Sequence, residues 1–203
     1  IWYEINSQIP YSGTSMNYHK NGQLAEKKIY RAGIYEGEHL SFYNNGALKT
    51  RIPYTLGERQ GMSEYFFKNG QIKKREIYSA GIKNGLWESF NEYGRLLKRE
   101  RYNQGKKDGL WESFKFGEPL RVENYKDGKL DGIYEEYDGG VLRLKTSYKN
   151  GLQHGLRKGK CEYKSYEYKC ETTYKDGKKH GTYKQYYNDK LWILQTYRNG
   201  KLH

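Results

Sequence analysis

The stretch Tyr125-Lys-Asp-Gly128-Lys-Leu-Asp-Gly132 decides the fold, because a version of it returns throughout the chain. In every copy an anchor tyrosine is followed three residues later by a glycine, and successive anchors are 23 to 26 residues apart. A second glycine follows four residues after the first in every copy but the last. The anchors are Tyr30, Tyr54, Tyr78, Tyr102, Tyr125, Tyr148, Tyr174 and Tyr197. Such spacing indicates a repeat protein in which each unit packs against its neighbours.

Each copy is predicted to form a β-hairpin. The dipeptides that end at Gly128 and Gly151 are Asp-Gly and Asn-Gly, which tolerate positive φ and close tight reversals. A strand such as 86–90 follows the second glycine, and a further turn, such as the one at Gly94, leads into a strand that returns to the next anchor. A helical fold is excluded because glycine recurs too often and no apolar stripe with a period of about 3.6 residues persists.

We therefore predict an all-β fold, an elongated and twisted single antiparallel meander of stacked β-hairpin repeats. About eight repeats of 23–26 residues form a single domain over residues 1–203. The first copy, 6–29, is degenerate, the copy at 148–173 is irregular, and the last copy, 197–203, is truncated.

The composition predicts a thin core made of aromatic rings. Only 35% of residues are hydrophobic, but 16% are aromatic, and each aromatic side chain can bury roughly 150–250 Å². We expect leucines such as Leu48 to share a face with the anchor six residues later. A second column, twelve residues after the anchors, contains Phe42, Phe66, Phe90, Phe114, Tyr137 and Tyr186. A third, nine residues after the anchors, contains Trp87, Trp111, Tyr134 and Tyr183, for which core packing and exposed contact both remain open.

The unit Tyr-Lys-Asp-Gly-Lys-x-x-Gly-x-Tyr/Trp-x-x-Tyr/Phe, followed by a glycine turn, resembles the MORN repeat (membrane occupation and recognition nexus) over residues 6–203. It is most similar to a bacterial variant whose members are often labelled antitoxins of toxin–antitoxin pairs. The resemblance implies an all-β repeat scaffold with a role in protein interaction, membrane-lipid association or toxin neutralisation. It implies no catalytic residue, because the family has no fixed set of functional residues.

The irregular copy holds both cysteines, Cys161 and Cys170, and Gly155-Leu-Arg-Lys-Gly replaces its aromatic strand motif. The midpoint between the cysteines falls at 165–166, where a hairpin tip is expected. The two cysteines are therefore predicted to lie opposite one another, close enough for a disulfide. A disulfide implies an oxidising compartment. Two free thiols in a cytosolic protein are the alternative.

The sequence carries no motif for catalysis, metal binding or cofactor binding. His154 and His180 occupy a repeat position that elsewhere holds Glu, Gln, Asn or Asp, which indicates a turn site rather than a ligand or a base. Two cysteines without a Cys-x-x-Cys motif argue against zinc, and no nucleophile elbow or phosphate-binding loop occurs. We predict a non-enzymatic protein without metal or cofactor.

A net charge of +13, spread along the chain, favours acidic partners. We predict a protein-binding scaffold, either antitoxin- or immunity-like or interacting with a cell-envelope protein. Its expected contacts come from outward-facing Trp87 and Trp111 and from Arg99 and Arg101. Peripheral binding of anionic lipid through the basic surface is the alternative. Nucleic acid is disfavoured, because acidic residues are interleaved with basic ones, as in 73–76.

No transmembrane segment is expected, because the longest purely apolar run, 191–194, is far shorter than the roughly 20 residues of a membrane helix. The chain begins at Ile1 rather than at a methionine, so we expect an upstream segment, and a removed signal peptide is one explanation. Together with a disulfide, this favours an extracytoplasmic location (periplasmic, secreted or cell-surface) in a bacterium.

Overall fold

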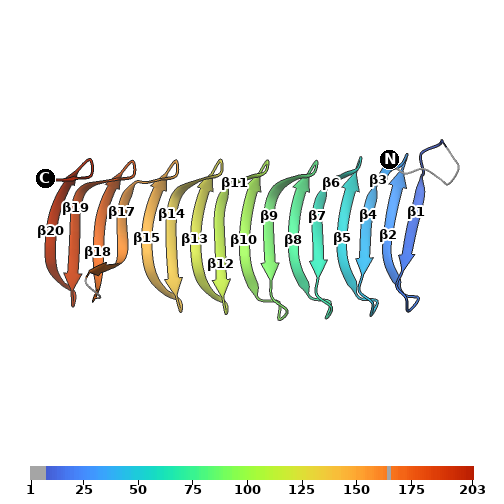
Figure 1. Cartoon of the computed structure of the whole chain (residues 1–203), viewed down its shortest axis with the longest axis horizontal. Helices are drawn as coiled ribbons and strands as arrows, with labels where there is room; N and C mark the ends of the chain where they lie inside the picture. Colours follow the sequence, from blue (N-terminus) through green and yellow to red (C-terminus); the bar gives the residue numbers. More distant parts are fainter. Residues whose placement is uncertain (1–7, 164–165) are drawn as a thin grey trace. The chain divides into compact units, whose positions relative to one another are not determined.

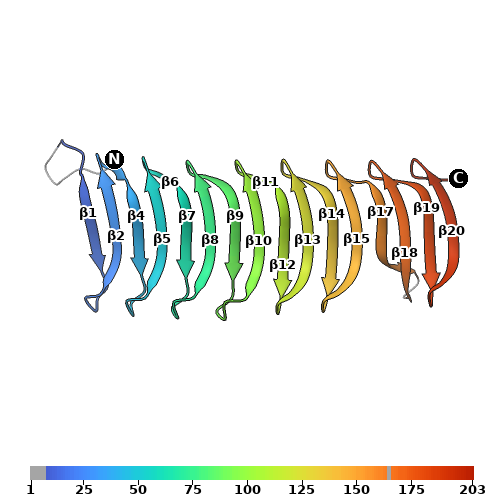
Figure 2. The same cartoon turned by 180° about the vertical axis from the view of Figure 1, so that it is seen from behind.

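The computed structural model describes residues 8–163 and 166–203, and its strands follow the repeat. The described secondary structure is entirely β and forms one antiparallel sheet of 21 strands in meander order (Figure 1 and Figure 2). This confirms the predicted all-β meander of hairpins. The start of the degenerate first copy at 6–7 and part of the expected hairpin tip, at 164–165, lie outside the described residues.

The chain divides into two compact units, residues 1–106 and 107–203. The first contains β1 (Gly13–Tyr18), β2 (Leu24–Arg31), β3 (Ile34–Tyr35), β4 (Gly37–Phe42), β5 (Leu48–Thr55), β6 (Glu58–Arg59), β7 (Gly61–Phe66), β8 (Ile72–Ser79), β9 (Ile82–Phe90) and β10 (Leu96–Asn103). At the boundary lies β11 (Lys106–Lys107). The second contains β12 (Gly109–Lys115), β13 (Glu118–Lys126), β14 (Lys129–Asp138), β15 (Val141–Lys149), β16 (Leu152–Gln153), β17 (Gly155–Tyr163), β18 (Tyr166–Lys175), β19 (Lys178–Tyr187), β20 (Lys190–Arg198) and β21 (Lys201–Leu202).

Each anchor tyrosine leads into a two-residue turn, which we call an anchor turn. Both central residues have positive φ, as at Asp127 (49°) and Gly128 (82°), and this type I′ geometry matches the twist of paired strands. Asp and Asn adopt positive φ more readily than other non-glycine residues, and the second unit has one of them at every anchor turn. The first unit instead places Ala32, Leu56, Ala80 and Gln104 there.

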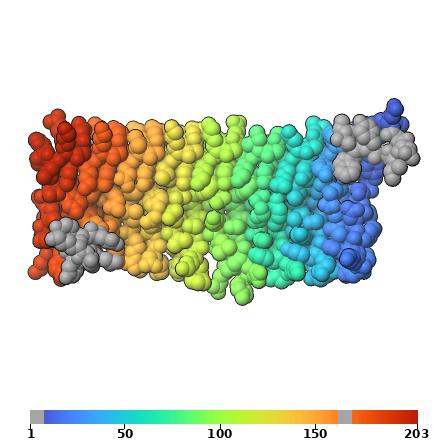
Figure 3. All heavy atoms as spheres, in the orientation of Figure 1, coloured from blue at the N-terminus to red at the C-terminus, as the bar shows by residue number. Residues whose placement is uncertain are grey.

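Consecutive anchor turns within a unit are joined by backbone hydrogen bonds. The Gly57 N–H donates to the Tyr35 carbonyl at 2.9 Å, and the Gly177 N–H donates to the Gln153 carbonyl at 2.8 Å. The same bond recurs one repeat apart at Gly33, Gly81, Gly105, Gly128, Gly151 and Gly200. Each turn is thereby fixed on the preceding repeat, and within each unit the side chains of successive hairpins form parallel bands (Figure 3).

A side chain six residues after an anchor accepts a hydrogen bond from the next anchor turn. Asn84 Oδ1 accepts from the Gln104 N–H at 3.3 Å, and Asp131 Oδ2 accepts from the Asn150 N–H at 2.9 Å. This is the position that His154 shares with Glu, Gln, Asn and Asp, and the His154 Nδ1 lies 3.2 Å from the Asp176 carboxylate of the next turn. In the structure, the side chain at this position therefore links one repeat to the anchor turn of the next.

The second recurring glycine lies outside the anchor turn: it begins a strand in four copies and lies inside a longer strand in the other three, as at Gly132. Gly132 has φ 114° within β14, where the pairing of β13 with β14 shifts register between Glu123 and Tyr125. The Asn124 Nδ2 donates to the Ile133 carbonyl beside it at 2.9 Å. The glycine therefore permits a backbone conformation that side-chain-bearing residues rarely adopt.

A further register shift places the two main aromatic columns on opposite faces. Ser41 pairs with Thr50 but Phe42 pairs with Leu48, so β5 contains an extra residue between them. Because such a bulge interrupts the alternation of side chains, Leu48 joins Phe42 and not Tyr54. The prediction that the leucines share the face of the anchors is wrong for this reason. The shift recurs between β7 and β8, β9 and β10, β12 and β13, β14 and β15, and β19 and β20.

We call the face that carries the anchor tyrosines the tyrosine face. The opposite face, which we call the phenylalanine face, carries Phe42, Phe66, Phe90, Phe114, Tyr137 and Tyr186.

Candidate functional site

The tyrosine face is a layer of rings with a cation held between them. The Trp87 ring centroid lies 5.2 Å from those of both Tyr78 and Tyr102. The Lys83 Nζ lies 4.2 Å from the Trp87 centroid and 4.7 Å from the Tyr102 centroid. Aromatic faces attract an ammonium group, and the methylene stem of a lysine packs on apolar surface. Lys83 therefore bridges the rings of successive repeats.

The second unit repeats this arrangement. The Lys107 Nζ lies 4.0 Å from the Trp111 ring centroid and 4.5 Å from that of Tyr125, and the Lys179 Nζ lies 5.0 Å from that of Tyr183. A lysine-and-ring core explains how so polar a chain holds a sheet together.

Carboxylates on the same face accept hydrogen bonds from the tyrosine hydroxyls. The Tyr102 hydroxyl donates to Glu100 at 3.4 Å, and the Tyr125 hydroxyl donates to Glu123 at 3.2 Å. Burial raises the pKa of both tyrosines to about 12, and the neighbouring carboxylate raises each pKa in the same direction. Burial also lowers the pKa of His39, which lies between tyrosine rings in the first unit.

These raised pKa values predict loss of stability in alkali. The pKa of these tyrosines is about 12 in the folded state and near 10 in the unfolded state. Their contribution to the stability of the folded state is therefore fully present below pH 10. That contribution disappears as the pH rises through 12. We expect the melting temperature to fall steeply between pH 10 and 12, measured by circular dichroism alongside tyrosinate absorbance. Tyr125→Phe removes one titrating group and is expected to make the fall shallower, whereas an equally steep fall would contradict this explanation.

The structure corrects the expectation that Trp87 and Trp111 face outward. Both are only 8% exposed, and the Trp87 Nε1 donates to the Ile77 carbonyl at 3.0 Å. Trp87 pairs with Glu76 and Glu100, and Trp111 pairs with Glu123, each of which lies two residues before an anchor tyrosine. The register therefore places both rings on the tyrosine face, between the anchor tyrosines. They are core residues.

Arg99 and Arg101 project from the opposite face. Glu100 pairs with Trp87 in the β9–β10 register, so its two neighbours in the chain point away from the tyrosine face. The Arg99 Nε lies 3.3 Å from Glu88 Oε1. The structure therefore does not bring Arg99 and Arg101 together with Trp87 in one site.

Opposite charges alternate from strand to strand on the phenylalanine face of the first unit. The Arg51 Nη1 lies 2.9 Å from Glu64 Oε2, and the Arg75 Nε lies 3.7 Å from Glu64 Oε1. Opposed charges of unlike sign stabilise neighbouring strands, whereas like charges destabilise them. Because these side chains are partly exposed, each pair contributes at most about 1 kcal/mol, and the alternation chiefly disfavours other registers.

A column of exposed aliphatic side chains also lies on the phenylalanine face, eight residues after the anchors. In the second unit it contains Leu110, Ile133 and Leu156, which are 41%, 43% and 42% exposed. In the first unit Met62 holds the same position and is 47% exposed. We call these four residues the aliphatic column. Reasoning from the sequence missed it, although its only signal is visible there: an apolar residue follows five of the seven second glycines, the exceptions being Glu38 and Thr182.

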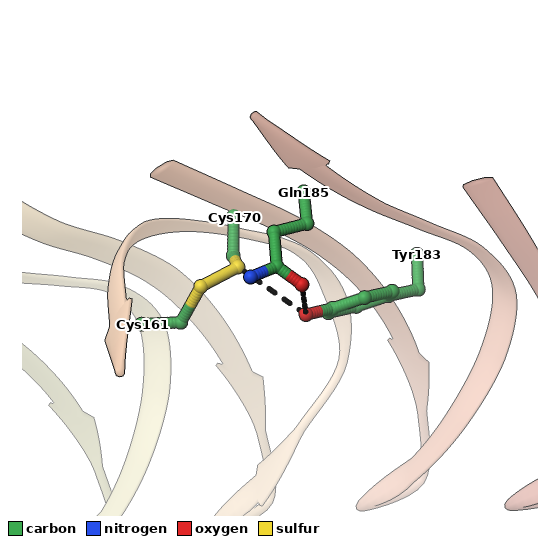
Figure 4. Close-up of a disulfide and its surroundings, with 4 residues drawn as sticks. All are labelled: Cys161, Cys170, Tyr183 and Gln185. Atoms are coloured by element: carbon green, nitrogen blue, oxygen red, sulfur yellow. Dashed lines mark hydrogen bonds between the residues drawn. A yellow bond between two sulfur atoms is a disulfide. The ribbon is translucent and has the colours of Figure 1, made fainter. Parts of the chain in front are cut away.

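The structure joins Cys161 and Cys170 by a disulfide between β17 and β18, with Cα atoms 5.9 Å apart (Figure 4). The prediction that the two cysteines lie directly opposite one another is wrong. They are diagonal, because Cys170 pairs with Gly159 and Cys161 pairs with Tyr168. The pairing of β17 with β18 keeps one register from Gly155 and Tyr174 onward. This register, and not the midpoint between the two cysteines, determines which residues are opposed. The Tyr183 hydroxyl, 3.4 Å from the Cys170 Sγ, links the bridge to β19.

Within residues 8–163 and 166–203, no group of three or more His, Cys, Asp or Glu side chains is placed to hold a metal ion. The same part of the chain has no helix that is long and apolar enough to cross a membrane.

Comparison with known protein families supports the repeat assignment. Residues 11–32, 35–55 and 179–202 match the family model of the MORN repeat variant. No curated protein matches the chain. Repeats of this family are non-catalytic and generally serve as protein- or membrane-binding modules. The remaining hairpins share the anchor turns and turn-to-turn bonds of the matched ones.

Proposed function

We propose that the chain is a non-enzymatic protein-binding scaffold that contacts its partner through the phenylalanine face. The observation that carries the proposal is the aliphatic column, which places an exposed apolar side chain at one repeat position in both units. A rigid sheet loses little conformational entropy on binding, and contact surfaces combine apolar centres with charged surroundings.

Charged residues beside the column belong to the same proposed surface. Arg99 and Arg101 remain candidates for partner contact, since both are exposed on the phenylalanine face. Trp87 and Trp111 serve this surface only indirectly, by holding the sheet on which it is built. The proposed partner is a toxin that the chain neutralises, as an antitoxin or immunity protein would, or a protein of the cell envelope.

Site-specific photo-crosslinking tests the proposal. A benzophenone amino acid replaces Ile133 in the full chain, and Ser113, on the tyrosine face of the neighbouring strand pair, is the matched control position. In cells of the organism that encodes the chain, we expect Ile133 to capture a defined protein and Ser113 to capture none. Equal capture at both positions, or none at either, would contradict the proposal.

Binding to anionic lipid is a second candidate, favoured by the anchor-turn edge of the second unit. Directly opposed basic pairs flank three of its turns: Lys126 and Lys129, Lys175 and Lys178, and Arg198 and Lys201. Each basic residue near an anionic membrane contributes about 1 kcal/mol. Sedimentation with phosphatidylglycerol vesicles that disappears at high salt would favour this candidate, and no sedimentation at low salt would exclude it.

A further inference from the structure

The irregular copy at 148–173 lacks the ring that each of the other untruncated copies from Tyr30 onward places on the phenylalanine face. Lys160 holds the position twelve residues after Tyr148, where the other copies have Phe or Tyr. It lies in β17 on the same face as Leu156 and Lys158, by strand alternation. The aromatic column is therefore interrupted between Tyr137 and Tyr186.

A pocket of about 620 Å³ lies at this interruption. Leu142 of β15 and Tyr186 of β19 line it from strands on either side of β17 and β18, and Lys160 lies between them. Gly159 lines it too, and a Cβ there would lie 2.7 Å from the Arg143 carbonyl oxygen, so this glycine lets β17 lie close on β15. A volume of this size lies within the ordinary range of ligand pockets.

The alternation of charge breaks at the same place. Lys145 lies directly opposite Lys158, and Lys160 lies directly opposite Lys169. Like charges in these positions destabilise a sheet. Carboxylates of the same chain already pair with Lys145 (Glu135, 2.8 Å), with Lys158 (Glu171, 2.8 Å) and with Lys169 (Asp189). Five basic and two acidic side chains still line the pocket, an excess of three positive charges. The pocket is therefore apolar at its sides and cationic around them.

We propose that this pocket receives an aromatic side chain flanked by acidic residues from the protein partner. The inference rests on the proposed function and gives the partner's chemistry. The inserted ring takes the place in the aromatic column that Lys160 leaves without one, next to Leu142 and Tyr186. The flanking carboxylates offset the excess of positive charge that the pocket's own two carboxylates leave. A short acidic segment suits this open pocket of about 620 Å³, which has room for a ring and for the residues beside it, whereas a lipid headgroup would use the charge but not the apolar walls.

Fluorescence anisotropy with synthetic peptides tests the proposal. The probe is a labelled short peptide with one phenylalanine flanked by glutamates, and its matched variants replace the phenylalanine by alanine or the glutamates by lysines. We expect the probe to bind the full chain, and we expect the dissociation constant of each variant peptide to be at least about tenfold higher than that of the probe. Equal binding of the alanine variant would overturn the aromatic role, and equal binding of the lysine variant would overturn the acidic one.

Substitutions in the protein locate the site. Lys160→Tyr restores the ring of the column, so we expect it to fill the pocket, preserve the fold and abolish probe binding. Lys149→Tyr, at an exposed position outside the pocket, is the matched control and is expected to bind normally. If Lys160→Tyr alters the circular dichroism spectrum, Lys160→Gln, which keeps the side chain flexible and removes its charge, is expected to weaken binding severalfold. Unchanged binding by a folded Lys160 variant would overturn the proposal.

The results separate this inference from the proposed function. Capture of a protein at Ile133, without any effect of Lys160→Tyr on that capture or on probe binding, would reject the pocket and keep the scaffold. Binding of phosphatidylglycerol vesicles that Lys160→Tyr abolishes, without binding of any peptide, would reject a protein ligand at this pocket.

Discussion

Trp87→Ala is expected to lower the free energy of unfolding by about 3–5 kcal/mol, the cost of removing a large buried aromatic side chain. The ring lies between Tyr78 and Tyr102, and Lys83 lies over it. The substitution also removes the donor to the Ile77 carbonyl. Urea denaturation followed by circular dichroism measures the change.

Trp192→Ala is the matched control, because Trp192 is 53% exposed. We expect its effect to stay below about 1 kcal/mol, since less apolar surface is removed from a buried environment. A Trp87→Ala variant with near-normal stability and lost partner binding would return Trp87 to the binding surface and contradict its place in the core.

Gly132→Ala is expected to lower the free energy of unfolding by about 2–3 kcal/mol, because it adds both backbone strain and steric crowding. The residue has φ 114°, beyond the left-handed region that alanine tolerates best, and a Cβ would lie 3.0 Å from the Asn124 Cβ. The change also displaces Asn124 from the Ile133 carbonyl. Thermal unfolding of the Gly132→Ala variant and of the parent chain measures the loss of stability.

Gly139→Ala provides the comparison for the same substitution. Gly139 has φ 57° and no atom within 4 Å of an added Cβ, so its cost is the left-handed conformation alone, about 1–2 kcal/mol. Equal destabilisation by the two variants would show that the irregular strand at Gly132 relaxes freely.

The hairpin architecture was predictable because its determinants are local. Asp127-Gly128 and Asn150-Gly151 specify their turns within two residues, and the regular return of the anchor tyrosines implies stacking. The assignment of faces was not predictable by counting. One extra residue, next to Leu48 in β5, places Leu48 on the face opposite to the one that counting in twos from Tyr54 predicts. Only the strand register reveals this extra residue.

The candidate site was harder to predict for the same reason. The sequence shows that Trp87 recurs in a column but not that Lys83, four residues earlier, would lie over its ring. Likewise, the sequence marks the copy around Lys160 as irregular. That Leu142 and Tyr186 flank a pocket there depends on strands separated along the chain. Opposed lysines such as Lys145 and Lys158 become visible only once the register is known.

The turn-to-turn hydrogen bonds also bear on how such a chain changes length in evolution. Each anchor turn provides a donor to the hairpin before it, and each hairpin provides an acceptor for the one after it. Duplicating or deleting one complete hairpin in the gene would therefore rejoin equivalent partners, whereas a fractional insertion would leave a donor and an acceptor without their counterparts. Selection can thus lengthen or shorten the scaffold in whole hairpins, and a single copy such as the one with Lys160 is free to diverge while its neighbours keep the common pattern.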